Sequence, residues 1–197
     1  MIDIGNLEQR LDLAWLRPYG MASVGLFAIG ALAGGMAIIF YPETAEQLQE
    51  LLKQFAKMFQ GMSRLRLAAA IFLNNSVKTL LVILLGPLLG LTPVVFLIVN
   101  GAILGAVIPV AVESKGLWSA LMTIIPHGIF ELPAIFIGTS IGIRLGVHPF
   151  RRLAGKTDST FLAELAHGLR LFVSVILPLL LLAAAIEVFV TPLIAGL

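Results

Sequence analysis

The sequence has no cysteine and few charged residues, and both absences limit what the protein can do. Without cysteine, the 197-residue chain cannot form disulfides, thiolate zinc sites, iron–sulfur clusters or a cysteine nucleophile. Charged residues make up 12% of the chain, about half of the roughly 25% found in soluble domains, whereas hydrophobic residues make up 59%. The net charge is only +2, so the pI near 9.2 indicates no nucleic-acid partner. This composition, with a mean hydropathy of +1.02, predicts a protein of the lipid bilayer.

The apolar stretches predict an all-α, polytopic membrane helix bundle with about five membrane segments. Each is close to or longer than the ~20 residues that a helix needs to cross a ~30 Å hydrocarbon core. Residues 1–17 place apolar side chains at helical spacing and predict an interfacial helix, and residues 18–197 form a single membrane domain. The expected segments are residues 19–41, 67–90, 94–112, 117–145 and 169–197.

Residues 42–66 predict an amphipathic helix between the first two segments. Acidic residues come first and basic residues last, which complements the helix dipole at both ends. We expect its apolar stripe to lie against the membrane surface or another subunit. The stripe consists of Leu48, Leu51, Leu52, Phe55, Met58, Phe59 and Met62.

The fourth segment is too long for one simple crossing, and Pro126, Gly128 and Pro133 interrupt it. We therefore expect a broken or re-entrant helix there. With five full crossings, lysine and arginine are slightly more frequent on the side of the N-terminus, which predicts a multi-pass protein of the cell membrane with a cytoplasmic N-terminus.

Glycines four residues apart recur in four of the five segments. Such spacing lets helix backbones approach closely in lipid. The faces serve either packing within one bundle or, with the triple-glycine face as the first candidate, the seam of a homodimer or other homo-oligomer. The sets are Gly30/Gly34, Gly86/Gly90, Gly101/Gly105 and Gly138/Gly142/Gly146.

Polar side chains within the apolar segments are the candidate functional residues. Burial of charge at membrane depth is costly, so these groups are expected to face the protein interior and to have partners. Lys78 and Glu131 are predicted to pair, and His127 and Glu131, four residues apart, share one helix face. The candidate site consists of Asn75, Lys78, Asn100, His127 and Glu131, with Asn74, Ser76 and Glu187 as further costly groups.

Three interpretations of this cluster stay open. It is a site for an ion or small polar solute in a channel or transporter, or a satisfied hydrogen-bond network that fixes helix register in a scaffold. As a minor alternative, His127 and Glu131 supply two zinc ligands of an intramembrane metal-dependent hydrolase, although a catalytic site usually needs a third. We expect no enzyme activity and no cofactor.

Two other patterns are expected to carry no chemistry. The G-x-S-x-G pattern around Ser140 lies in an apolar helix rather than on the strand-to-helix turn that a serine nucleophile requires. His148 and His167 are expected to be solvated residues outside the hydrocarbon.

Several of these motifs together resemble the stage II sporulation protein M family of membrane proteins. The resemblance begins at Phe72-Leu73-Asn74-Asn75-Ser76 and includes Asn100-Gly101 with Gly105. It continues through the P-H-G-x-x-E-L-P-A string at residues 126–134 and the run from Gly142 to Gly146.

The resemblance implies a membrane role without a known chemistry. The family's namesake acts in an assembly that remodels septal peptidoglycan, together with a cell-wall hydrolase and another membrane protein, so envelope proteins are expected partners. Members also occur in organisms that form no spores, so sporulation itself does not carry over. The polar intramembrane motif of the family falls on Asn75, Asn100, Gly101, His127, Gly128, Glu131 and Pro133.

Overall fold

The computed structural model describes residues 14–194, and within that range the secondary structure is entirely helical. This confirms the all-α fold class. The expected N-terminal helix lies outside the described residues except for its last few. The elements are η1 (Ala14–Leu16), α2 (Arg17–Phe40), α3 (Pro42–Met58), α4 (Arg64–Leu84), α5 (Leu91–Lys115), α6 (Leu117–Leu153), α7 (Phe161–Leu171), η2 (Phe172–Ile176), α8 (Leu177–Ala185), η3 (Ile186–Val190) and α9 (Thr191–Ile194).

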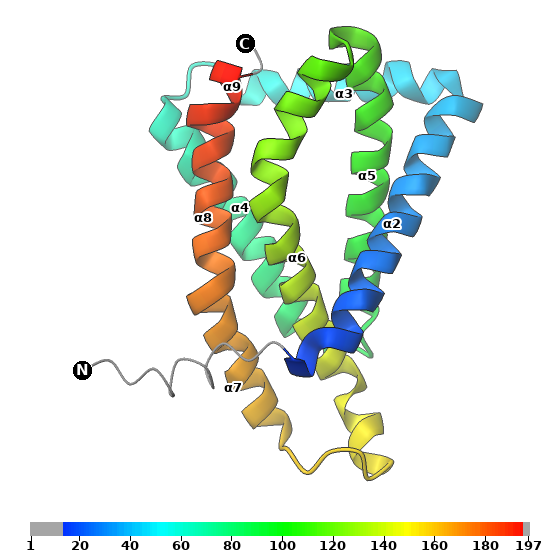
Figure 1. Cartoon of the computed structure of the whole chain (residues 1–197), viewed down its shortest axis with the longest axis vertical. Coiled ribbons are helices and arrows are strands. Elements are labelled where there is room, and N and C mark those ends of the chain that lie inside the picture. Colours follow the sequence, from blue (N-terminus) through cyan, green and yellow to red (C-terminus); the bar gives the residue numbers. More distant parts are fainter. Residues whose placement is uncertain (1–13, 195–197) are drawn as a thin grey trace.

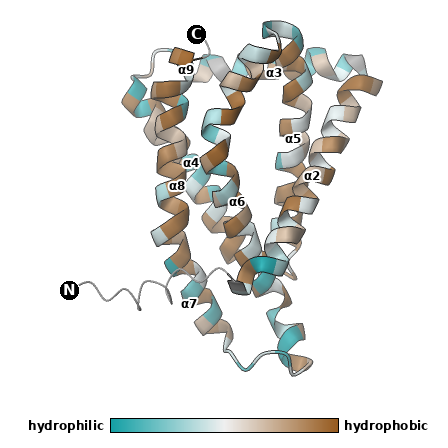
Figure 2. Ribbon diagram, viewed as in Figure 1, coloured by the Kyte–Doolittle hydropathy of each residue, from teal (hydrophilic) through white to brown (hydrophobic). Residues whose placement is uncertain are grey.

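Five helical stretches of the described chain are long and apolar enough to cross a membrane: α2, α4, α5, α6 and the run from α7 to α9. They stand side by side, and α3 lies across one end of the bundle (Figure 1). Apolar residues dominate the long helices, while polar residues gather on α3 and at the opposite end (Figure 2). The prediction of about five membrane segments and an amphipathic helix is therefore confirmed, but this helix ends at Met58 instead of residue 66, and α4 begins at Arg64.

Helix α6 differs from the expectation of a broken or re-entrant segment. It is one helix of 37 residues with three prolines inside it, and its two ends lie at opposite ends of the bundle (Figure 1). A proline removes one backbone donor, but neighbouring helices and hydroxyl side chains compensate for this loss in membrane bundles. The prolines thus do not end α6, which bends and crosses fully.

The glycine pairs of α2 and α5 face each other. A Cβ atom at Gly34 would collide with the carbonyl oxygen of Ala102, and one at Gly105 would collide with that of Ala31. Gly30 and Gly101 are equally close to the opposite backbone. This contact explains why the helices carry glycine at these positions.

The triple-glycine face of α6 is also occupied within the chain. Gly142 packs against the Val82 carbonyl oxygen, Gly146 against the backbone of Gly90, and Gly138 against Thr79. The alternative that this face forms a homodimer seam was therefore wrong. A homo-oligomer stays a prediction, and it requires another surface.

The half of the bundle near α7 is tightly closed. Ile83, Ile141, Leu145, Leu171 and Ile176 are each 0% exposed and form one cluster between α4, α6 and the last span. The other half, near α3, contains the polar side chains that the sequence singled out.

Candidate functional site

The candidate site is built on α6, where His127 and Glu131 lie one turn apart on the same face. Asn75 of α4 donates a hydrogen bond from Nδ2 to Oε1 of Glu131 at 3.1 Å. Asn74 Nδ2 in turn donates to Oδ1 of Asn75 at 3.1 Å, so the carboxylate is held by a short amide chain from α4.

Glu187 completes this cluster from the last span. Its Oε2 lies 2.6 Å from Nδ1 of His127, and the two side chains are 35% and 22% exposed. Glu187 lies in η3, a π-helical turn, and such turns are frequent at functional sites in helices. We call Asn75, His127, Glu131 and Glu187 the polar centre.

Lys78 does not belong to the polar centre. Its side chain is exposed on the outer face of α4, and the ion pairs of the described residues do not include it. Lys78 forms no direct ion pair with Glu131, because Asn75, one turn earlier on α4, contacts this carboxylate instead; the two charges still attract each other at longer range.

Asn100 reaches the same region from α5 but binds its own helix. Its Nδ2 donates to the Phe96 carbonyl oxygen at 2.7 Å. The Asn100 side chain nevertheless lines a cavity together with His127 and Glu131, so it faces the candidate site.

Two cavities meet at His127 and Glu131. The first, of about 300 Å³, lies between α2, α5 and α6, and Asn100 and Gly128 line it. The second, of about 850 Å³, lies between α4, α6 and the end of the last span, and Asn74, Glu187 and Thr191 line it. Since His127 and Glu131 line both, these two side chains lie where the cavities adjoin.

The groups named in the two enzyme alternatives lie at different places in the structure. Within residues 14–194, no group of three or more His, Asp or Glu side chains is placed to hold a metal ion. Ser140 is 1% exposed inside α6, and its Oγ lies 3.3 Å from that of Ser23.

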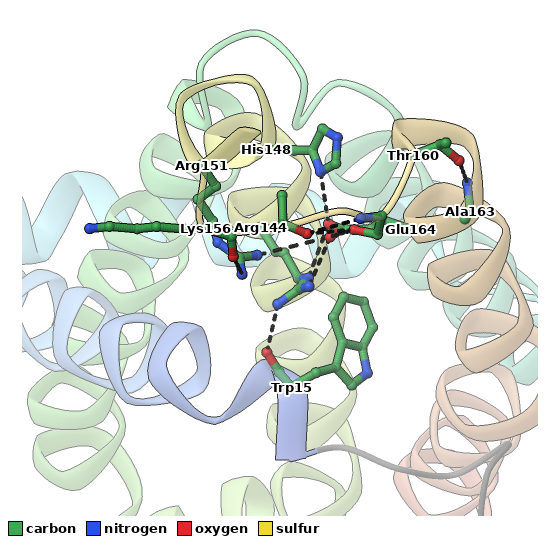
Figure 3. A network of polar contacts seen from close by, with 10 residues as sticks. Trp15, Arg144, His148, Arg151, Lys156, Thr160, Ala163 and Glu164 are labelled. Carbon is green, nitrogen blue, oxygen red and sulfur yellow. Dashed lines mark hydrogen bonds and ion pairs between the residues drawn. The ribbon is translucent and has the colours of Figure 1, made fainter. Parts of the chain in front are cut away.

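A second polar network lies at the opposite end of the bundle, around Glu164 of α7 (Figure 3). Arg144 of α6 donates from Nε to Oε2 at 3.0 Å and from Nη2 to Oε1 at 2.8 Å, which is a two-pronged ion pair. Ser159 Oγ donates to Oε1 at 2.6 Å. Glu164 is only 5% exposed, so this carboxylate is compensated almost entirely by protein groups.

The same network attaches the start of α2 and two histidines. Arg144 Nη1 donates to the Trp15 carbonyl oxygen at 3.1 Å, and its guanidinium lies 4.3 Å from the centre of the Trp15 ring. His148 is 3% exposed, with Nδ1 3.3 Å from Glu164 Oε2. The His167 ring packs edge-on against Trp15 at 4.8 Å. The expectation that both histidines are solvated was wrong for His148, because α6 extends beyond the other helices and packs against α7 there, whereas His167 is half-buried.

Glu187 and Glu164 are the residues that sequence reasoning undervalued. Glu187 was recognised as costly in lipid, but nothing local to it indicated a partner in another helix. Glu164 follows a polar connection and gave no signal of burial. The one signal for Arg144 was its place in the motif from Gly142 to Gly146.

A bundle of five membrane-length helices with ionisable groups between them defines a multi-pass membrane protein. The sequence profile described as Stage II sporulation protein M matches residues 23–192. The chain therefore belongs to this family, as the motifs indicated. It is also 32% identical over 127 residues to an uncharacterized protein of Methanocaldococcus jannaschii, over 62% of this chain and 70% of that protein. No solved structure matches the chain.

Proposed function

We propose that the protein is a non-catalytic channel or transporter that binds an ion or small polar solute at the polar centre. The observation that carries this proposal is the position of His127 and Glu131, which line both cavities. A solute moving between the cavities would pass these two side chains.

The balance of charge at the polar centre supports a binding role. Two carboxylates, Glu131 and Glu187, accompany one histidine, and Lys78 does not neutralise them as an ion-pair partner. Ionisable groups at membrane depth are costly, and they mark substrate, ion or proton pathways in membrane proteins. The network around Glu164 differs in sign, because one carboxylate there faces the guanidinium groups of Arg144 and Arg151.

The closed half of the bundle favours a gated protein over an open pore. Both cavities lie in the half near α3, whereas fully buried apolar side chains, including Ile141 and Leu145, fill the half near α7. A tightly packed half next to a half with cavities is what one state of an alternating-access transporter requires.

Flux into proteoliposomes tests this proposal. The wild-type protein is expected to pass protons or monovalent cations, and Glu131→Gln to abolish that flux, because glutamine retains the shape and the Asn75 contact but loses the charge. Glu113→Gln is the matched control, since Glu113 is exposed at the end of α5. A folded Glu131→Gln protein with unchanged flux would contradict the role of Glu131.

A second candidate function is a scaffold of an envelope-remodelling complex, and α3 favours it. This helix lies across the end of the bundle (Figure 1) and leaves Leu51, Leu52 and Met58 exposed at 61%, 39% and 67%. Such a surface suits an envelope protein partner, as membership of the Stage II sporulation protein M family suggests.

Site-specific photocrosslinking from position 51 distinguishes the scaffold from a simple membrane anchor. The scaffold predicts a protein adduct that disappears when Leu52 and Met58 are replaced by serine, with bundle stability unchanged. Crosslinks to lipid alone would remove the docking role.

We further propose that the protein lies in the cell membrane with the end near α7 on the cytoplasmic side, because this end carries more basic residues than the end near α3. The absence of cysteine makes this directly measurable, since a single introduced cysteine is then the only thiol. Asp158→Cys is expected to resist an impermeant maleimide in intact cells, and Gln47→Cys to react. The opposite pattern would invert the orientation. The basic residues in the described part of the chain are Arg17, Arg144, Arg151, Arg152, Lys156 and Arg170, against Lys53, Lys57, Arg64, Arg66 and Lys115 at the other end; the count from the sequence also includes Arg10, which lies outside the described residues.

A further inference from the structure

The larger cavity has the size and lining of a ligand site rather than of an ion site. Its volume of about 850 Å³ is far above the ~30 Å³ of one water molecule and lies in the range of small-molecule pockets. Its walls are mainly apolar, formed by Leu67 and Ile71 of α4 and by Ala183 and Val188 of the last span. A bare or hydrated inorganic ion would leave most of these walls without contact.

The polar groups of this cavity are concentrated on the side of α6 and η3. Glu131 and Glu187 both line it. The hydrogen bond from Asn75 uses only Oε1 of Glu131, and His127 contacts only Oε2 of Glu187. Each carboxylate therefore retains an oxygen that can accept a hydrogen bond from a ligand.

An unpaired hydroxyl in the same cavity points independently to a ligand. Thr191 is 3% exposed and lines the cavity, yet no described residue hydrogen-bonds its Oγ1. It follows Glu187 by four residues, so both lie along the cavity side of the last span. A buried hydroxyl without a partner is unfavourable by about 1–3 kcal/mol, and a bound polar group would remove that cost.

The charges around the cavity restrict the ligand further. Carboxylates at the polar centre attract a cation, whereas Arg64, exposed at the first turn of α4, lies on the same cavity and disfavours a second positive charge. Arg64 is eleven residues before Asn75, which corresponds to about 16 Å along a helix. Asn75 contacts Glu131, and the α4 residues that line the cavity between Arg64 and the two asparagines, Leu67, Ala70 and Ile71, are apolar.

We propose that the larger cavity binds an amphiphilic organic monocation, with its ammonium group at Glu131 and Glu187 and its apolar body against α4 and α8. An ammonium group has three donors, which suits two carboxylates and a hydroxyl. This inference rests on the proposed function in using the same polar centre, and it names the class of solute.

Equilibrium binding of hexylammonium to the full chain in lipid nanodiscs tests the inference. Saturable binding is expected for hexylammonium, and at least tenfold weaker binding for the neutral hexanol. Glu131→Gln should weaken hexylammonium binding at least tenfold. Thr191→Val should weaken it severalfold without loss of thermal stability, because valine has nearly the same shape and removes an unpaired hydroxyl. Val107→Ala, which alters only the smaller cavity, is the matched control and should stay within twofold.

Three results would overturn the inference: hexanol binding as tightly as hexylammonium, hexanoate binding more tightly, or full affinity in both Glu131→Gln and Thr191→Val. The flux assay separates this inference from the proposed function. Hexylammonium binding without any flux would refute transport and leave the ligand site intact. Flux of inorganic cations without hexylammonium binding would do the reverse.

Discussion

Replacing Glu164 by glutamine should strongly destabilise the bundle, although glutamine has nearly the same shape. Glu164 is 5% exposed and Arg144 13%, and the carboxylate accepts two hydrogen bonds from this guanidinium. In a glutamine, an NH2 donor replaces one of the two carboxylate oxygens and would face one of the two guanidinium nitrogens, which is also a donor. Arg144 would therefore keep a buried positive charge without the negative charge of Glu164. Removing one partner of a buried ion pair costs about 3–5 kcal/mol.

The expected loss lies near the lower end of that range. Arg144 keeps its hydrogen bond to the Trp15 carbonyl oxygen and its position over the Trp15 ring. A cation over an aromatic ring contributes about 0.5–2 kcal/mol, which partly compensates the unpaired charge. We therefore expect Glu164→Gln to lower the free energy of unfolding by ~3 kcal/mol.

Unfolding in mixed micelles, followed by helical circular dichroism and tryptophan fluorescence, measures this value. Asp158→Asn is the control, because Asp158 is an exposed acid in the same connection and should change stability by less than ~0.5 kcal/mol. The double variant Arg144→Met/Glu164→Gln should lose much less than the sum of the single losses. A loss below ~1 kcal/mol for Glu164→Gln, with additive behaviour, would refute the argument that charge compensation holds this network together.

Three further changes follow from the packing. Gly34→Val should destabilise the contact between α2 and α5 by ~3 kcal/mol or more, because its Cβ meets the Ala102 backbone, whereas Gly25→Val on the same helix has open space and should be nearly neutral in the same unfolding assay. Gly128→Leu also meets open space and should fold normally, but it fills the smaller cavity and should reduce flux severalfold; unchanged flux would place the solute path elsewhere. Ser140→Ala should retain flux and lower stability by no more than ~1.5 kcal/mol, whereas loss of all flux in a folded protein would reopen a chemical role for this serine.

Much of the fold was predictable because a helix that crosses the lipid needs an apolar run of about membrane length. Apolar runs of membrane length and the change to an amphipathic pattern at residue 42 were sufficient for five spans and a surface helix. The continuity of α6 was not predictable from local rules. Pro126 and Pro133 break helices in water, but a membrane bundle tolerates them when neighbouring groups compensate for the lost donors.

Part of the candidate site was predictable for the same reason. Asn75, His127 and Glu131 stood out as groups that lipid should exclude, and they do contact or adjoin each other. The choice of partners depends on how distant helices are rotated. Glu187 reaches His127 through a π-helical turn, whose rotation has no clear sequence signature, and that contact spans 60 residues of chain, the difference between 187 and 127.

Helix α6 has one half that is tightly packed and one half that borders cavities, and the polar centre lies in the second half. At Gly142 and Gly146, backbone lies against backbone, and Gly138 packs against the Thr79 side chain, so a displacement there would open close contacts. From Pro126 to Pro133, two backbone donors are missing and cavities lie on both sides, so bending in this half displaces little packed structure. His127 and Glu131 lie in the deformable half. A movement of α6 that pivots on its glycine half would therefore change the separation of His127 from Glu187, which is the contact that a bound cation would compete for.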